Sequence, residues 1–239
     1  MIGAEFPGKK SVGLLLDPDK AIGCQFADLL NTAGENGPDF ILVGGSITFT
    51  GIDKLIDEVR QRCSIPIVLF PGNLLQLSLK TDIILLLSLI SGRNSELLIG
   101  NHVIAAPFLK DVQERVVPVG YILIGSGIRT SVEYMSQTEA IPADKTDIAV
   151  ATALAGQLLG MKMIYLEAGS GASEPVPAGL VKAVRGNVSI PLAVGGGLRN
   201  KKSIEETFNA GADLIILGNG CEKDPSLLSD ACNIRDSFR

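Results

Sequence analysis

The sequence has few residues of the kinds that bind metals through nitrogen or sulfur. It contains one histidine, His102, and its four cysteines lie far apart with no C-x-x-C pair among them. Zinc sites and dithiol redox motifs need such closely spaced ligands, so both are disfavoured. Dispersed cysteines are typical of reduced thiols in cytoplasmic proteins, and we expect a cytoplasmic location.

Positive charge and long apolar runs are also scarce. The net charge of −5 argues against nucleic acid as a partner. An apolar segment at residues 83–90 (IILLLSLI) is far shorter than the roughly 20 residues of a membrane-spanning helix, so we expect no transmembrane segment. The first ten residues, MIGAEFPGKK, have no apolar stretch after a charged one, and no signal peptide is expected.

Apolar residues, by contrast, are abundant. They form 46% of the 239 residues, against 20% charged and 5% aromatic residues. A chain of this length can bury a full core, and we predict a single domain over residues 1–239. Part of the apolar surface is expected to line a ligand channel or a subunit contact, which favours a homo-oligomer.

Three apolar runs in the second half of the chain end in residues with little or no side chain. They are MKMIYLEAGSG (161–171), PLAVGGGLRN (191–200) and ADLIILGNG (212–220). A continuous apolar run is typical of a parallel strand buried on both faces. Turns of small residues let backbone N–H groups converge on an anion. Because the turns follow successive strands at the same end, we predict that they form one phosphate cradle.

The order of expected strands and helices predicts an α/β fold, a TIM (β/α)8 barrel. Strands are expected at residues 11–16, 39–43, 66–70, 82–89, 120–124 and 163–166, and in the runs that begin at 191 and 212. Helices are expected at residues 21–32, 52–62, 147–160 and 226–237. Residues 73–80 are too few for a crossover, which needs about a dozen residues, so the regular helix 3 is predicted to be missing or replaced by a loop.

A doubly wound open sheet is the alternative fold. It is disfavoured because the glycine-rich turns come late in the chain, whereas a dinucleotide fold has them after its first strand. In a barrel, the residues that follow each strand form the face that carries the chemistry. Polar residues expected on this face are Asp17, Ser46, Asn73, Arg93, Asn94, Glu167, Ser170 and Asn219.

These motifs, taken in order, closely resemble the geranylgeranylglyceryl phosphate synthase family over nearly the whole chain. The resemblance rests on Asp17-Pro18-Asp19-Lys20, Gly44-Gly45-Ser46, FPGN (70–73), SLISGRN (88–94), YLEAGSG (165–171), VGGGLRN (194–200) and Gly218-Asn219. It implies a TIM-barrel prenyltransferase without a regular third helix. With Mg²⁺, such an enzyme transfers a long prenyl group from its diphosphate to the C3 hydroxyl of sn-glycerol 1-phosphate, giving an ether-lipid precursor. The expected donor is geranylgeranyl diphosphate, heptaprenyl diphosphate remains open, and the expected assembly is a dimer or hexamer.

The resemblance also implies site residues. The sn-glycerol 1-phosphate site falls on Tyr165, Leu166, Glu167, Ala168, Gly169, Ser170, Gly171, Gly195, Gly196, Gly218 and Asn219, and the metal site on Asp17 and Ser46. One position departs from the family. Some members have a lysine two positions before the aspartate, where this chain has Leu15, so the first strand cannot supply a cation to the substrate.

Glu167 and Tyr165 are the catalytic candidates. Glu167 is the only carboxylate in its phosphate-binding run, and phosphate repels it, so it is expected to face the glycerol hydroxyls and accept the C3 proton. Its alternative is a pair with a neighbouring Arg or Lys. Tyr165 is expected to hydrogen-bond phosphate or glycerol, or to close over the prenyl groove; its alternative is a buried core tyrosine.

The donor is expected to bind near the third and fourth strands. Asn73, Arg93 and Asn94 are candidates for the diphosphate, because an arginine fork matches a pair of its oxygens; the alternative for Arg93 is a surface salt bridge. Residues 83–89 with Ile104, Pro107 and Phe108 are candidates for the prenyl channel, with core packing as the alternative. His102 is interpreted as a structural hydrogen-bonding residue and not as a base.

Two other functions remain open. A phosphosugar isomerase or aldolase would use the same cradle, but it needs a Schiff-base lysine or an acid–base pair at strand ends. No lysine ends an inner strand here. A catalytically silent phosphate-binding protein would not need Asp17, Ser46 and Glu167 together.

Overall fold

The computed structural model describes residues 9–21, 23–125 and 129–238. The strands are β1 (Ser11–Leu16), β2 (Phe40–Val43), β3 (Ile67–Leu69), β4 (Ile83–Leu89), β5 (Val116–Gly125), β6 (Ile141–Pro142), β7 (Met163–Glu167), β8 (Leu192–Gly195) and β9 (Leu214–Leu217). The α-helices are α2 (Gly23–Asn36), α3 (Ile52–Arg62), α4 (Asn101–Leu109), α5 (Ser131–Ser136), α6 (Thr146–Leu158), α7 (Ala178–Arg185), α8 (Lys201–Asn209), α9 (Asn219–Lys223) and α10 (Ser226–Asp236). The helical segments of 3-10 or π type are η1 (Leu74–Gln76), η2 (Glu96–Gly100) and η3 (Lys110–Arg115).

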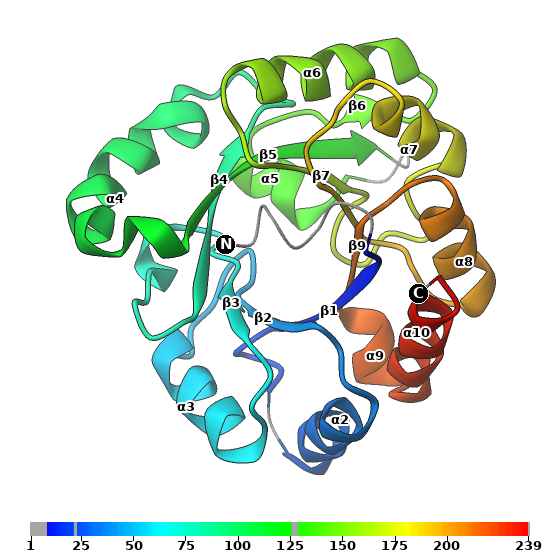
Figure 1. Cartoon of the computed structure of the whole chain (residues 1–239). Coiled ribbons are helices and arrows are strands. Elements are labelled where there is room, and N and C mark those ends of the chain that lie inside the picture. Colours follow the sequence, from blue (N-terminus) through cyan, green and yellow to red (C-terminus); the bar gives the residue numbers. More distant parts are fainter. Residues whose placement is uncertain (1–8, 22, 126–128, 239) are drawn as a thin grey trace.

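The strands close into a parallel barrel with helices around it (Figure 1). The hydrogen-bonded order is β4-β3-β2-β1-β9-β8-β7-β5, and a pairing of β4 with β5 closes the ring. The short strand β6 pairs with the end of β5. The predicted TIM barrel is therefore confirmed, and the carboxyl ends of its strands meet at one face, as such a barrel requires.

Alternation along the strands divides the core into two clusters. Met163 and Tyr165 of β7 point into the barrel and pack with the side chains of other strands, such as Ile216. Ile164 and Leu166 belong to the cluster between the barrel and its helices. Because successive side chains of a strand point to opposite faces, Glu167 lies on the same side of β7 as Tyr165, inside the barrel.

The connection between β3 and β4 contains one short turn, η1, where a regular barrel has a helix. The buried side chain of Gln76 holds this connection in place. Its Nε2 donates to the carbonyl of Gly45 at 2.6 Å, and its Oε1 accepts the N–H groups of Gly72 at 3.0 Å and Gly45 at 3.3 Å. The prediction for helix 3 is confirmed. In Figure 1 the ring of helices is correspondingly thin between α3 and α4.

Several segments differ from the sequence-based expectation. Helix α2 extends to Asn36, beyond the predicted end at residue 32, and no ranges were predicted for α5, α7, α8, α9 or β6. Strand β5 begins at Val116 and not at the predicted residue 120. Helix α4 was not predicted, because its apolar residues are not confined to one face: Val103, Ile104 and Phe108 are exposed, whereas Ala105 and Leu109 are buried. Such a helix lacks the single apolar stripe that marks an amphipathic helix. Within the described ranges, no helix has both the length and the apolar character needed to cross a membrane.

Candidate active site

A polar cavity of about 350 Å³ lies at the carboxyl ends of the strands. The turns after β7, β8 and β9 line it together, as the cradle prediction required. Several of their glycines have positive φ, among them Gly169 at 103°, Gly171 at 81° and Gly196 at 79°, a region that glycine enters without steric cost. Predicted site residues on its wall are Asp17, Ser46, Tyr165, Glu167, Gly169, Ser170, Gly171, Gly196, Gly218 and Asn219.

Other predicted site residues lie behind this wall. Leu166, Ala168 and Gly195 are not among the lining residues. The Leu166 side chain faces the helices, and the Ala168 N–H donates to the Gly195 carbonyl at 3.0 Å. These residues join β7 to β8 beneath the cradle.

Tyr165 and Glu167 form a buried hydrogen-bonded pair in the floor of the polar cavity. The Tyr165 hydroxyl donates to Oε2 of Glu167 at 2.6 Å, and the Gly169 N–H donates to Oε1 at 2.7 Å. Burial, and then the Glu167 charge, raise the pKa of Tyr165 well above its ordinary value, so the hydroxyl stays a donor. Burial raises the pKa of Glu167, while these two hydrogen bonds oppose the rise. Two donors facing one carboxyl group favour its ionised, acceptor-only form.

Glycines beside Glu167 leave room for this pair. A Cβ at Gly195 would lie 2.9 Å from Oε2 of Glu167 and against the Tyr165 hydroxyl. A Cβ at Gly196 would meet Oε1 of Glu167 and lie 2.8 Å from the Gly169 nitrogen. Side chains at these positions would displace the carboxylate, so the VGGG motif shapes the floor as well as the turn.

Asp17 and Ser46 lie on adjoining loops at the edge of the polar cavity. A Cβ at Gly45 would be 3.3 Å from Oδ1 of Asp17, which places that carboxylate against the loop that carries Ser46. The Asp19 carboxylate accepts the N–H groups of Phe49 and Thr50 and holds this loop to the β1 turn. Among described residues, no group of three or more His, Cys, Asp or Glu side chains is arranged to hold a metal ion.

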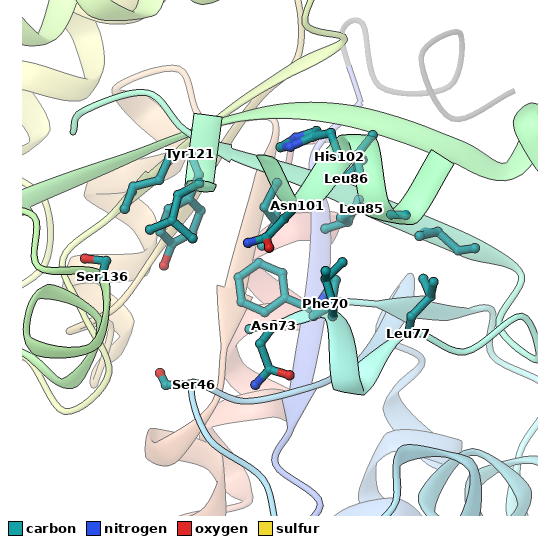
Figure 2. A pocket seen from close by; sticks show the side chains of 18 of the residues that line it. Ser46, Phe70, Asn73, Leu77, Leu85, Leu86, Asn101, His102, Tyr121 and Ser136 are labelled. Atoms are coloured by element: carbon teal, nitrogen blue, oxygen red, sulfur yellow. The ribbon is translucent and has the colours of Figure 1, made fainter. Parts of the chain in front are cut away.

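A second, apolar cavity of about 300 Å³ adjoins the polar one, with which it shares lining residues. Figure 2 shows side chains that line this apolar cavity. It runs between β4, the β3–β4 connection and α4, where the regular third helix is missing. In Figure 2 the Phe70 ring lies between Ser46 and Asn73 on one side and Asn101 and His102 on the other. The residues common to both cavities are Gly45, Ser46, Phe70, Tyr121, Val132 and Met135.

Three aromatic rings mark the junction of the cavities. The ring centroids of Tyr121 and Tyr165 are 5.1 Å apart, and those of Phe70 and Tyr165 are 5.6 Å apart, both with edge-to-face geometry. Such pairs contribute about 0.5–1.5 kcal/mol beyond area burial, so the cluster holds the junction rigid. Tyr121 was not predicted as a site residue, although alternation along β5 places it inside the barrel.

The three diphosphate candidates have different positions. Asn73 lines the apolar cavity near Ser46, and its Oδ1 also accepts the Leu75 N–H at 2.9 Å. Arg93 Nη1 donates to the carbonyl of Gly92 at 2.7 Å, and Asn94 Nδ2 donates to that of Ser136 at 3.1 Å. Neither residue lines either of these two cavities. Asn73 thus lies on the wall of the apolar cavity, Arg93 braces its own loop, and Asn94 ties that loop to the end of α5.

Helix α4 supplies channel residues that differ from those expected. Ile104, Pro107 and Phe108 do not line the apolar cavity, whereas Ala105 and Leu109 do, beside Ile84 to Leu87 and Leu89 of β4. The difference arises because these residues form a helix whose Ile104 and Phe108 side chains face outwards. His102 lines the cavity, with its Nε2 2.8 Å from the Ser88 hydroxyl, which agrees with the structural role expected for it.

The raised pKa of Glu167 predicts a pH-dependent stability. The carboxyl group binds its proton more tightly in the folded than in the unfolded chain, so its contribution is favourable below the ordinary pKa of 4.5 and is lost as pH rises through the folded-state pKa. The melting temperature of a Glu167→Gln variant should therefore rise relative to that of the unchanged protein as pH increases above 4.5. Thermal unfolding of both proteins across this pH range measures the difference between their melting temperatures. A difference independent of pH would contradict the raised pKa of Glu167.

The fold and the two joined cavities define a TIM-barrel protein with a glycine-lined polar site at its catalytic face and an apolar channel beside it. The PcrB family matches residues 9–234, and the chain belongs to this family, that of the geranylgeranylglyceryl phosphate synthases. A relative of that name from Spirosoma linguale is 47% identical over 97% of this chain and 93% of its own length. One from Korarchaeum cryptofilum is 36% identical over 95% of this chain and 94% of its own.

A solved structure extends the likeness to the fold. The (S)-3-O-geranylgeranylglyceryl phosphate synthase from Thermoplasma acidophilum, crystallised in complex with its substrate sn-glycerol-1-phosphate, superposes with a TM-score of 0.88 at 30% identity. The match covers 98% of this chain and 95% of that one.

Proposed function

We propose that the protein transfers a long-chain prenyl group, from geranylgeranyl diphosphate, to the C3 hydroxyl of sn-glycerol 1-phosphate. The observation that carries this proposal is the junction of a polar, glycine-lined cavity with an apolar one at Ser46 and Phe70. A reaction between a small phosphorylated alcohol and a hydrocarbon diphosphate needs both environments side by side. The family membership and the named relatives support the same reaction.

The polar cavity suits the glycerol phosphate. Its phosphate would lie among the N–H groups of the turns after β7, β8 and β9, and the glycerol would extend towards Glu167. The C3 oxygen forms a bond to C1 of the prenyl group as the bond from C1 to the diphosphate breaks. Glu167 would accept the hydroxyl proton, and its raised pKa brings the carboxylate closer to the strength of a useful base.

Mg²⁺ is the metal that the chemistry of these residues fits best. Asp17 supplies a carboxylate and Ser46 a hydroxyl oxygen on adjoining loops, and Mg²⁺ is usually held by one or two carboxylates, substrate phosphates and several waters. When bound, the ion would neutralise the diphosphate that leaves. Asn73, on the wall of the apolar cavity, would orient the diphosphate. Arg93 and Asn94 remain candidates only for a form in which their loop rearranges, since their side chains contact backbone carbonyls here.

The apolar cavity suits the prenyl chain. The edges and faces of Phe70, Tyr121 and Tyr165 surround the point where the chain would enter, and aromatic faces stabilise nearby positive charge such as that which develops on an allylic carbon. A phosphosugar isomerase or aldolase would have no use for a channel of this kind. Heptaprenyl diphosphate is the alternative donor. Two exposed apolar residues, Leu158 at the end of α6 and Leu159 directly after it, support the further proposal of a homo-oligomer.

The proposal is tested by a prenyl transfer assay. Labelled sn-glycerol 1-phosphate is incubated with Mg²⁺ and, separately, with C15, C20 and C35 prenyl diphosphates, and each reaction is repeated with EDTA. We expect an ether product that requires the metal and forms fastest with the C20 donor. Preference for the C35 donor would instead identify the alternative. No product with any donor, from folded protein that binds glycerol phosphate, would exclude the transferase and return attention to phosphosugars.

Filling the apolar cavity should discriminate between donors. Ala105→Phe adds a ring to a buried position on the cavity wall, in space that a long donor would fill. If the steric conflict with the donor costs about 1–3 kcal/mol, as overpacking of a filled site does, kcat/KM for a long donor falls about 5- to 150-fold. Binding of glycerol phosphate should change little. Ala106→Phe is the matched control. Ala106 is next to Ala105 on α4, but it is exposed and does not line the cavity. Equal kcat/KM values for both variants across the donor series would place the prenyl chain elsewhere.

A further inference from the structure

Cationic side chains are few at the polar cavity, although its proposed ligand is a phosphate. Leu15 lines the wall at the position where some family members have a lysine. Among the described lining residues, the cations are Lys20 and Arg199. Arg199 Nη2 donates to the carbonyls of Gly171 at 3.0 Å and Ala172 at 2.8 Å, and thereby braces the turn after β7. Lys20, from the Asp17-Pro18-Asp19-Lys20 motif, is the cation whose role the proposed reaction leaves open.

The turn after β1 directs Lys20 across the mouth of the cavity. The backbone N–H of Lys20 donates to the Asp17 carbonyl at 3.0 Å, which folds the chain back at this point. The ammonium group then lies 2.7 Å from Oδ1 of Asn219, at the start of α9. It is also 3.6 Å from Oδ2 of Asp17 and 3.5 Å from Oε2 of Glu222. Lys20 thus links Asp17, the candidate metal ligand, to Asn219 in the turn after β9.

The acceptors around Lys20 hold its ammonium group through one hydrogen bond and two longer ion pairs. An ammonium group has three N–H donors and no acceptor, and here an amide oxygen and two carboxylates surround it. Its charge is balanced locally by Asp17 and Glu222. A cation in this position therefore acts through its neighbours.

The neighbour that it controls is Asn219. Because an ammonium group only donates, Asn219 must turn its carbonyl oxygen towards Lys20, and its NH₂ group must then face the other way. That NH₂ group lies 3.3 Å from the Ser170 hydroxyl, across the cradle between the turns after β9 and β7. We propose that Lys20 is a positioning residue, which holds the Asn219 amide with its N–H donors towards the bound phosphate.

Loss of the ammonium group would remove the preference for this orientation of the Asn219 amide. The amide would then face the Asp17 and Glu222 carboxylates without a cation between them, and its NH₂ group would turn towards those acceptors. The Asn219 carbonyl oxygen would then face the phosphate, and the negative oxygens of the phosphate would repel it. The expected defect is therefore weaker binding of sn-glycerol 1-phosphate, with the chemical step at saturation little changed. This inference rests on the proposed function for the identity of the ligand.

The test is a calorimetric titration of sn-glycerol 1-phosphate into the unchanged protein and the variants Lys20→Met, Asn219→Ala and the double variant. We expect Lys20→Met to raise Kd about tenfold or more, as for a lost hydrogen bond to a charged group. We expect no further increase when Lys20→Met is added to Asn219→Ala, because the amide that Lys20 orients is then gone. Lys20→Arg should restore part of the affinity, and KM for glycerol phosphate should rise more than kcat falls.

Lys223→Met is the matched control, since it removes an exposed positive charge from the same short helix, α9. Unchanged affinity in Lys20→Met would overturn the inference. Additive losses in the double variant, or an equal loss in Lys223→Met, would overturn it too, because both indicate general attraction of the phosphate. Absence of binding by the unchanged protein would instead count against the proposed function itself.

Discussion

Replacement of Glu167 by glutamine is expected to lower kcat for prenyl transfer by about 10²- to 10⁴-fold, the range that a general base contributes. The amide keeps the shape of the side chain and its place between Tyr165 and Gly169, so the cradle should still bind glycerol phosphate within a few-fold of its original affinity. Single-turnover assays with separate titrations of each substrate measure the two effects independently.

Two further variants make this prediction specific. Glu174→Gln removes an exposed carboxylate from the loop after β7, and its kcat should stay within about twofold, as for a surface substitution. Tyr165→Phe removes the hydroxyl that donates to Glu167 and opposes the rise in its pKa, so the acidic limb of the rate profile should move to higher pH. Full activity in Glu167→Gln would assign proton acceptance to another group or to water.

Substitution of Gly196 by alanine is expected to lower activity by about 10²-fold or more. The new methyl group would press on Oε1 of Glu167 and lie 2.8 Å from the Gly169 nitrogen, and a misplacement of about 1 Å at a reacting group costs about that much. Stability should fall as well, because a φ of 79° costs a residue with a side chain about 1–2 kcal/mol. Thermal unfolding and kcat/KM report the two effects.

Gly160→Ala separates the backbone cost from the contact with Glu167. Gly160 follows α6 with a φ of 92°, and a Cβ there would meet no atom within 4 Å. The variant should lose similar stability, about 2–8 °C in Tm for a chain of this size, and keep its activity. If both alanine variants retain full activity, the floor of the cavity tolerates the methyl group, and the shape argument for the VGGG motif is wrong.

The barrel itself was predictable because buried parallel strands are continuous apolar runs. Residues 11–16 and 52–62 were placed to the residue, since Asp17 and Pro18 follow the strand directly and the helix has a single apolar stripe. The absent third helix followed from the length of one connection. Helix α4 was beyond such reasoning, because it is apolar on both its buried and its exposed sides, and local pattern does not say which side is which.

The site was predictable to a similar degree. The motifs indicated which turns meet, since the carboxyl ends of parallel strands share one face. They did not indicate which atoms contact one another. That Tyr165 binds Glu167, that Arg93 contacts its own loop, and that Gln76 fastens one loop to another all depend on side-chain positions set by the tertiary structure. Lys20 was visible as part of a motif, but its partner Asn219 is 199 residues away.

Helix α4 separates the apolar cavity from the exterior with a single layer of nine residues. Asn101, His102, Ala105 and Leu109 face inwards, and Val103, Ile104 and Phe108 face outwards. The two sets share no member. Substitutions of the outward-facing residues can therefore change the surface, for a partner subunit or for solubility, and leave the lining of the channel unchanged. Substitutions of the inward-facing residues can likewise change the channel and leave that surface unchanged. Two traits encoded in one short segment are in this way free to diverge independently among descendants of the same ancestral barrel.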